Sequence, residues 1–521
     1  MRKALLAVFC LPFMITGCGG GSAIDGGALI ASYVNEFNSD DEELYMQKFP
    51  NDKALGFLTE NIPVFECPDK ELEKTYYFRW WTFRKHIKEI PQGYIISEFL
   101  PDVPWAGKYN AISCAASHHL AEGRWLHDSQ YLDAYARFWV SEDGSPRNYS
   151  FPAADATLKL YQVHPDRQLI EDTYPGLKEI FAAWEADHKD PNGLFWQIDD
   201  RDGMEVSVSG DLCADHRGYR ATINSYMYAD AMALAEMARI LGKADEADVY
   251  EAKAVEIKSL MDEYLWDGEA RFYKVIPRDG RMEKSPVREE HGFVPWVYDI
   301  PDADKTEAWL QLKDPQGFKA PYGPTTAEQR AEGFKVAYEG HECQWNGPSW
   351  PFATTQTLTG LANTLHRFGE GVMTKADYYE ALSIYSNSHR RVNESGRTVC
   401  WIDENLNPFT GDWISRTLLQ AWNNQYKERG KDYNHSAFCD LVISGLIGVQ
   451  PRTDGSIAIE PLVPEDQWDY FCLQDLDCAG RNLTILYDKD GRKYHRGKGF
   501  RIYVNGEKVF TSDTYATKAI I

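Results

Sequence analysis

The sequence predicts a mainly α-helical protein that ends in a small antiparallel β domain. Two observations predict this fold class: apolar residues recur at helical spacing through most of the 521 residues, and apolar residues alternate with polar ones near the C-terminus. The clearest helical stripe repeats every three or four residues and is followed by Gly242, a residue typical of helix ends. The stripe consists of Met227, Ala231, Leu234, Ala238 and Leu241.

Helical patterns extend from about residue 107 to 447 and are interrupted by long loops. A second helix follows the first after a short link, which indicates an α-helical hairpin. Further helices are expected at 349–368, 376–388, 413–427 and 436–447. We therefore assign residues 27–447 to one large helical domain.

The tail has the pattern of β-strands. Apolar residues alternate at 457–459, 483–487 and 500–504, and Asn505-Gly506 is a typical two-residue hairpin turn. This pattern predicts a separate β domain over residues 448–521.

The first residues resemble a bacterial export signal. Arg2 and Lys3 precede an apolar run that is too short to span a bilayer, and the run ends at Ile15-Thr16-Gly17-Cys18. We predict a signal peptide at 1–17, lipidation at Cys18 and a flexible tether at 18–26. The protein is thus expected to be lipid-anchored in the cell envelope of a bacterium, in the periplasm or on the outer-membrane surface.

Composition narrows the possible functions. The formal net charge of −24 makes nucleic acid an unfavourable partner, because phosphates repel an acidic surface. The 16 Trp and 30 Tyr suit stacking against sugar rings, although large helical cores are also rich in aromatic residues. The eight cysteines after Cys18 are scattered without a C-x-x-C pair, and we expect most to be buried free thiols.

Three loops combine carboxylates with aromatic residues, at 192–210, 342–352 and 400–413. Cleavage of a glycosidic bond requires one carboxylic acid that protonates the leaving oxygen and a second carboxylate that activates water or attacks carbon. Apolar surroundings keep the first carboxyl protonated near neutral pH. Any single acid in such a loop is better explained as a turn former or helix cap, but two aromatic-rich acidic loops in one helical protein favour a catalytic site.

These loops resemble those of the inverting glycosidases that include trehalases, glycoside hydrolase family 63 and the mannosylglycerate-hydrolase-like group. Residues 203–207 (G-M-E-V-S) are similar to the G-M-D-N-S-P loop that holds the general acid, with Glu in place of Asp and no Pro. Residues 345–350 (W-N-G-P-S-W) are similar to the W-R-G-P-x-W segment of the sugar site, with Asn in place of Arg. Residues 404–411 (E-N-L-N-P-F-T-G) match the E-x-x-[DN]-P-x-T-G motif that holds the general base.

The resemblance implies an (α/α)6 barrel, the six-hairpin glycosidase fold, with Glu205 as general acid and Glu404 as general base. Because Glu205 replaces an Asp, Asp202 or Asp199 remain alternatives for the acid. The substrate-binding candidates come from the same loops and from the segment at 99–110. They are Gln344, Trp345, Trp350, Trp105, Tyr109, Asn110 and Trp401.

No cofactor and no metal are implied. The His118-His119 pair with Glu122 has near-metal spacing, but no further ligand is evident. Histidines buried in a helix or in the pocket wall explain this pattern better than a metal site. The predicted partner is a carbohydrate substrate. Three other functions stay open: a glycoside phosphorylase, a polysaccharide lyase on a similar fold, and a non-catalytic glycan-binding lipoprotein.

Overall fold

The computed structural model describes residues 22–521. The predicted signal peptide and Cys18 lie outside the described residues. The end of the predicted tether belongs to the folded domain instead, because Ala23 and Ile24 both donate backbone hydrogen bonds to Oε1 of Gln474. The first helix then begins at Gly26. Within the described range, no helix combines the length and apolarity needed to cross a bilayer.

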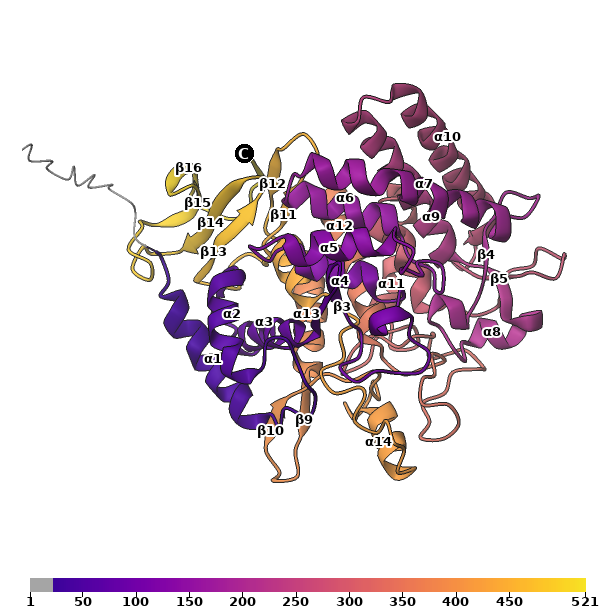
Figure 1. The fold of residues 1–521 in the computed structure, drawn as a ribbon, viewed down its shortest axis with the longest axis horizontal. Helices are drawn as coiled ribbons and strands as arrows, with labels where there is room; N and C mark the ends of the chain where they lie inside the picture. Colours follow the sequence, from indigo (N-terminus) through magenta and orange to yellow (C-terminus); the bar gives the residue numbers. More distant parts are fainter. Residues whose placement is uncertain (1–21) are drawn as a thin grey trace, which may run out of the picture.

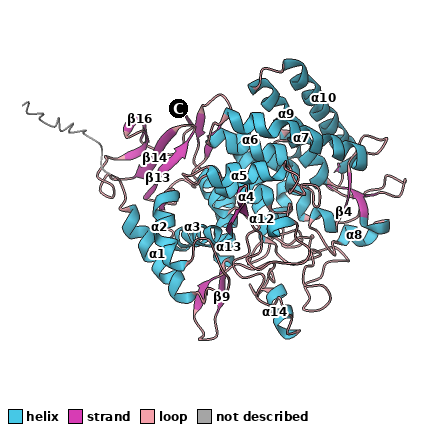
Figure 2. Cartoon of the chain, in the orientation of Figure 1, coloured by secondary structure: helices cyan, strands magenta, loops and turns pink. Residues whose placement is uncertain are grey.

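Helices dominate the structure, and the strands gather mainly at one side (Figure 1, Figure 2). The long helices are α1 (Gly26–Asp40), α2 (Ala54–Asn61), α3 (Lys70–Phe83), α4 (Ala116–Gly123), α5 (Gln130–Trp139), α6 (Ala153–Val163), α7 (Arg167–His188), α9 (Ala221–Ile240), α10 (Ala244–Leu260), α12 (Pro351–Phe368), α13 (Lys375–Ser388) and α14 (Ile414–Ala421). Shorter helical pieces are α8 (Val208–Leu212), α11 (Leu310–Lys313), α15 (Phe438–Asp440), η4 (Asp200–Asp202), η7 (Glu290–Tyr298), η8 (Ala303–Trp309) and the π-helical turns η6 (Met261–Leu265) and η9 (Leu441–Leu446).

Six helical segments form a closed inner ring. Going around the ring, α4 contacts α6, α6 contacts α9, α9 contacts η7, η7 contacts α12, α12 contacts η9, and α15, which continues into η9, contacts α4. The helices α3, α5, α7, α10 and α13 pack against this ring from outside. The predicted (α/α)6 barrel is thereby confirmed.

Position in the ring explains how differently neighbouring helices are buried. In the inner helix α9, 15 of 20 residues are buried, whereas only 3 of the 17 residues in the outer helix α10 are. The apolar stripe predicted on α9 therefore describes only one of its two buried faces. The other face carries polar residues with partners, such as Asp230, which accepts hydrogen bonds from the backbone N–H groups of Ala154 and Asp155 and so caps the start of α6.

Two predicted helices end earlier or change type. The helix expected at 413–427 stops at Ala421, shortly before Asn423 adopts a left-handed backbone conformation with φ of 50°. The helix expected at 436–447 consists of α15 followed by the π-helical turn η9. The helices at 351–368 and 375–388 lie within a few residues of their predicted bounds.

The C-terminal region forms two antiparallel sheets, in agreement with the predicted β domain. The larger sheet has the order β1-β13-β14-β15-β16, built from Val64–Glu66, Tyr470–Cys478, Arg481–Asp488, Gly499–Val504 and Glu507–Ser512. The smaller sheet has the order β11-β12-β17, from Val449–Pro451, Ile457–Ile459 and Ala519–Ile520. Asn505 and Gly506 both have positive φ, as a type I′ hairpin turn requires. The sequence did not reveal β1, which comes from the N-terminal region and pairs Val64 with Gln474.

Short hairpins and strands support the loops of the barrel. They are β2 (Ile87–Ile90) with β3 (Gly93–Ile96), β4 (Trp196–Ile198) with β5 (Arg217–Tyr219) and β8 (Ile276–Pro277), β6 (Trp266–Asp267) with β7 (Phe272–Tyr273), and β9 (Arg390–Val392) with β10 (Thr398–Cys400). All eight cysteines in the described residues are free, and most are buried.

A buried ionic cluster ties distant segments together. The ammonium group of Lys85, with a fully buried side chain, lies 2.7 Å from carboxylate oxygens of both Asp41 and Asp432. Lys431 pairs with the same two carboxylates. These contacts join the end of α1, the end of α3 and the segment around residue 432.

We predict that replacing Lys85 by Met destabilises the protein by about 3–5 kcal/mol, because two buried carboxylates lose a cation. Lys88→Met is the matched control, since the ion pair of Lys88 with Asp102 is exposed and should contribute at most about 1 kcal/mol. Urea unfolding of both variants measures the difference. Equal stabilities of the two variants would contradict a structural role for the cluster.

Candidate functional site

A cavity of about 340 Å³ opens where the inner helices α4 and α12 begin. Its walls come mainly from the three loops singled out in the sequence and from the segments around residues 98–114 and 429–433. The lining residues are Glu98, Phe99, Trp105, Ile112, Cys114, Tyr149, Asp200, Arg201, Gly203, Glu205, His341, Glu342, Cys343, Trp345, Trp350, Glu404, Arg429 and Tyr433. The cavity therefore combines carboxyl groups with aromatic rings.

The first loop presents Glu205 to the cavity. The turn η4 ends at Gly203 with φ of 75°, and Met204 then inserts its side chain beside Trp345 and Trp350. Val206 follows with φ of 59°, which is strained for a β-branched residue. Such strain persists only where surrounding contacts enforce it, and it is common at functional sites.

The second loop is bonded to the first through Trp345. The backbone N–H of Trp345 donates to the carbonyl oxygen of Glu205 at 3.1 Å, and its indole N–H donates to Oε2 of the same residue at 2.8 Å. The rings of Trp345 and Trp350 stack with centroids 4.1 Å apart. Two further backbone hydrogen bonds, between Ser349 and Leu406, join the second loop to the third.

Burial governs the protonation of Glu205. Removal from water raises the pKa of this carboxyl to about 8, which outweighs the opposing effect of the hydrogen bond from Trp345. No cation forms an ion pair with Glu205 among residues 22–521. At neutral pH the group is therefore mainly protonated and can donate its proton.

Glu404 has opposite surroundings. Nη2 of Arg429 lies 3.1 Å from its Oε2, and the thiol of Cys343 donates to its Oε1 at 2.7 Å. Arg429 also pairs with Glu342 at 2.9 Å, so one guanidinium serves two carboxylates. The backbone N–H of Glu404 donates to Oδ1 of Asp403, which holds the backbone of Glu404 in place. A carboxylate paired with a cation is suited to accept a proton.

Trp105 forms the exposed rim of the cavity. Its side chain is 42% exposed, although it contacts Phe99 edge-on and lies 5.1 Å from the guanidinium of Arg429. A large aromatic face at the mouth of a polar cavity offers a surface for stacking.

The other acids proposed from the first loop do not reach the cavity. Asp202 is buried behind its wall and accepts a hydrogen bond from Thr222 at the start of α9. Asp199 accepts from the backbone N–H of Asp200 and lies beside His216, within the loop itself. Of the three carboxyl groups considered for the acid, only Glu205 lines the cavity.

Four of the substrate-binding candidates also lie away from the cavity. Asn110 is buried and bonds the backbone of Val103, Phe99 and Pro101, so it holds its own loop together. Tyr109 packs near Phe138.

The remaining two are held by neighbouring side chains and backbone. The amide of Gln344 donates to the carbonyl oxygens of Glu339 and His341. Trp401 is buried with the guanidinium groups of Arg391 and Arg416 at 3.8 and 4.7 Å from its ring.

The sequence did not single out Glu98, a further carboxyl group of the cavity, which is buried. Its Oε1 accepts a hydrogen bond from Tyr433, whereas its Oε2 has no partner among the described residues. Burial raises the pKa of Glu98 to about 8, so it is also mainly neutral at pH 7. No local pattern identifies it, because Glu98 and Tyr433 meet only through the fold.

The pair His118 and His119 belongs to the helical wall. Nε2 of His119 lies 2.6 Å from the carbonyl oxygen of Asn434, and Glu122 accepts from the backbone N–H groups of Cys439 and Asp440. Across residues 22–521, no three His, Cys, Asp or Glu side chains are arranged to hold a metal ion.

Comparison with known proteins matches this chain to a glycoside hydrolase family. Residues 108–436 match the family model described as the mannosylglycerate hydrolase MGH1-like glycoside hydrolase domain. A solved structure named "Sialidase" is 41% identical, with a TM-score of 0.87 over 95% of this chain. This chain spans only 44% of the length of that protein.

More distant structures share the fold. A glycoside hydrolase family 63 mannosylglycerate hydrolase from Thermus thermophilus, solved with glucose, has a TM-score of 0.52 at 14% identity, over 71% of this chain and 99% of that one. A family 78 rhamnosidase of a Bacillus species has the same TM-score and identity, over 82% of this chain and 40% of that one.

Burial raises the pKa of both Glu205 and Glu98 to about 8, so we predict that more than one glutamate carboxyl keeps its proton until about pH 8 and that one of these signals disappears in Glu205→Gln. Carbon-13 NMR of δ-labelled glutamate, recorded as a pH titration, measures this. Trp345→Phe should raise the pKa further, because the indole N–H stabilises the charged form. The same exchange at the exposed Trp422 should change nothing. A Glu205 signal that titrates entirely below pH 6 would overturn the assignment.

Proposed function

This chain belongs to the mannosylglycerate hydrolase MGH1-like glycoside hydrolase family, and from that premise we propose that it cleaves a glycosidic bond of an oligosaccharide or small glycoside by an inverting mechanism. The observation that carries the proposal is the contrast between two carboxyl groups in one cavity. Glu205 is protonated by burial, and Glu404 is paired with Arg429. An acid and a base for glycoside hydrolysis require such opposite surroundings.

In the proposed reaction, the carboxyl of Glu205 transfers its proton to the glycosidic oxygen as the bond from that oxygen to the anomeric carbon breaks. Glu404 takes a proton from a water molecule, whose oxygen attacks the anomeric carbon from the opposite face. The configuration at that carbon is inverted, and one water is consumed for each bond cleaved. Arg429 and Cys343 position Glu404, and Trp345 positions Glu205.

Substrate binding is assigned to the groups that face the cavity. Trp105 offers its exposed ring for stacking at the mouth, and Trp345 and Trp350 form an aromatic wall. The neutral carboxyl of Glu98 can donate a hydrogen bond to a sugar hydroxyl through its unpartnered oxygen.

A panel of aryl glycosides and oligosaccharides first identifies a sugar that the protein cleaves. We then predict that the Glu404 and Glu205 variants lose different amounts of hydrolysis rate on two glycosides of that sugar. Glu404→Gln should lower the rate of hydrolysis at least about a hundredfold on both substrates, which corresponds to an activation barrier raised by roughly 3 kcal/mol. On an alkyl glycoside, Glu205→Ala should lower the rate of hydrolysis by about 10²–10⁴-fold, which is the contribution typical of a general acid. It should lose far less on a dinitrophenyl glycoside, whose leaving group needs no proton. Initial rates and the anomer released, observed by proton NMR, are the measurements.

Glu394→Gln is the matched control, because Glu394 is exposed on the β9–β10 hairpin and should behave as the unaltered protein. Release of the retained anomer would exclude the inverting role of Glu404. An equal loss of Glu205→Ala on both substrates would exclude its role as acid. A requirement for phosphate, or an unsaturated product, would identify a phosphorylase or a lyase instead.

We also propose that the protein is anchored in a bacterial cell envelope through a lipid on Cys18. The support is the sequence alone: a short apolar run that ends in Ile15-Thr16-Gly17-Cys18. Cys18→Ser should release the protein from the membrane fraction of an expressing bacterium and abolish labelling with radioactive palmitate. A variant that stays in the membrane fraction would contradict the anchor.

A further inference from the structure

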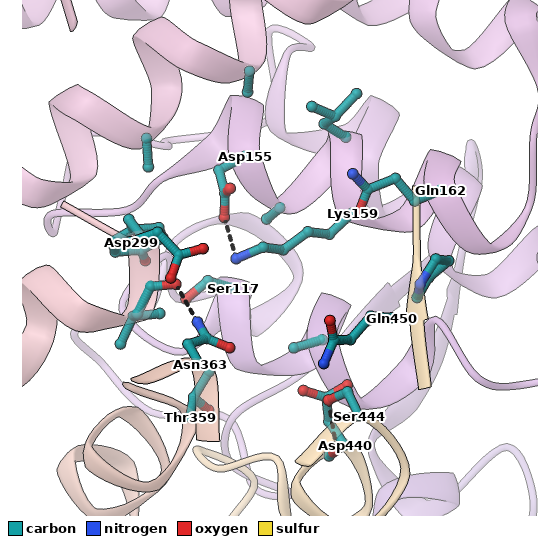
Figure 3. Close-up of a pocket in the computed structure, with 18 of the residues that line it drawn as sticks. Ser117, Asp155, Lys159, Gln162, Asp299, Thr359, Asn363, Asp440, Ser444 and Gln450 are labelled. Carbon is teal, nitrogen blue, oxygen red and sulfur yellow. Dashed lines mark hydrogen bonds and ion pairs between the residues drawn. The ribbon is translucent and has the colours of Figure 1, made fainter. Parts of the chain in front are cut away.

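A second cavity, of about 720 Å³, lies between the inner helices and shares no lining residue with the first. It is lined by residues of α4, α6, α9, α12 and β11 and by Lys518. Figure 3 shows Ser117, Lys159, Thr359 and Gln450 among the lining residues. Trp350, just before α12, lines the first cavity, whereas the second is lined along α12 from Thr355 to Arg367. At 1.5 Å per residue the second cavity therefore extends from roughly 8 to 25 Å along the helix from Trp350.

Most of the charged groups around the second cavity form ion pairs. Asp155 pairs with Lys159 at 2.8 Å, which Figure 3 shows in the upper part of the cavity. Arg124 pairs with Asp440 at 2.7 Å.

The same holds at the rim of the second cavity. Lys518 pairs with Glu460 at 2.9 Å, and Arg239 pairs with Glu236 at 3.3 Å. These charges compensate each other, which leaves Asp299 as the one lining carboxyl without an ion pair among the described residues, so the walls offer no unpaired cation to attract an acidic ligand.

Several neutral polar groups of the walls lack partners within the described part of the chain. Nε2 of Gln450 and both ring nitrogens of His366 are buried without a hydrogen bond. The side chain of His366 is only 6% exposed, and burial lowers its pKa to about 4. The imidazole is therefore neutral, with one nitrogen that donates and one that accepts. Buried polar groups without partners are rare and need a water or a ligand.

We propose that this cavity is an accessory binding site for a neutral, polyhydroxylated ligand of about the size of a di- or trisaccharide. Hydroxyl groups both donate and accept, so they suit the amide of Gln450, the neutral His366 and the carboxyl of Asp299. The volume lies within the roughly 300–1,000 Å³ of ligand sites. Tyr228 and Tyr298 supply apolar wall. The proposal goes beyond the catalytic function, since binding here needs neither Glu205 nor Glu404.

The test uses the full chain with Glu404→Gln, which prevents turnover, and isothermal titration calorimetry. The probes are maltotriose, mannotriose, cellotriose, xylotriose and arabinotriose, with trigalacturonate as a charged comparison. We expect two independent binding events for at least one neutral probe. Trp105→Ala should weaken one event at least about tenfold, and Gln450→Ala combined with Asp299→Asn should weaken only the other by a similar factor.

Gln420→Ala is the matched control, because Gln420 is exposed on α14 and belongs to neither set of lining residues, and it should change neither event. In the protein with intact Glu404, Gln450→Ala should leave the rate of hydrolysis unchanged. The absence of a second event with every neutral probe overturns the proposal, as does preferential binding of trigalacturonate at the second site. Binding and hydrolysis are measured in separate experiments. The accessory site can therefore be rejected without rejecting the proposed hydrolase function, and the reverse is also true.

Discussion

The buried cluster of Lys85, Asp41 and Asp432 fixes the segment on which the cavity of Glu205 and Glu404 depends. Taking these charges out of water is unfavourable unless each finds an opposite charge, so the three segments that carry them must meet in one geometry. The chain next to Asp432 supplies Arg429, which pairs with Glu404, and Tyr433, which bonds Glu98. Removing Lys85 would therefore also disturb Arg429 and Tyr433, which contact the carboxyls of the cavity.

The same principle, applied inside the cavity, gives Glu205 and Glu404 different surroundings. Glu404 is buried and Glu205 is half-buried, but only Glu404 has a guanidinium within ion-pair distance. Burial without a cation favours the neutral acid, whereas burial with a cation favours the carboxylate. Backbone hydrogen bonds from Trp345 to Glu205 and between Ser349 and Leu406 hold the three loops in register, so the contrast does not depend on flexible side chains alone.

The inner ring explains why polar groups are buried around both cavities. Inner helices are enclosed on nearly all sides, so their polar residues need partners from neighbouring helices, as Asp230 finds at the start of α6. Where the ring is not filled by side chains, the polar groups face a cavity instead. One such cavity holds the carboxyls of Glu98, Glu205 and Glu404, and the other holds Gln450 and His366 without protein partners among the described residues.

The sequence by itself determined those features that depend on neighbouring residues along the chain. The helical stripe of α9, the hairpin turn at Asn505-Gly506 and the three loops rich in carboxylates and aromatic residues are local patterns, and the structure contains each of them. Only the tertiary structure decided which side chains of a loop face the cavity. Glu205 lines it while Asp202, three residues earlier, turns to Thr222, and Trp401 is held between two arginines instead. Tertiary contacts also brought in Glu98, Arg429 and strand β1, because the direction of a side chain and the partner of a strand are set by residues far away along the chain.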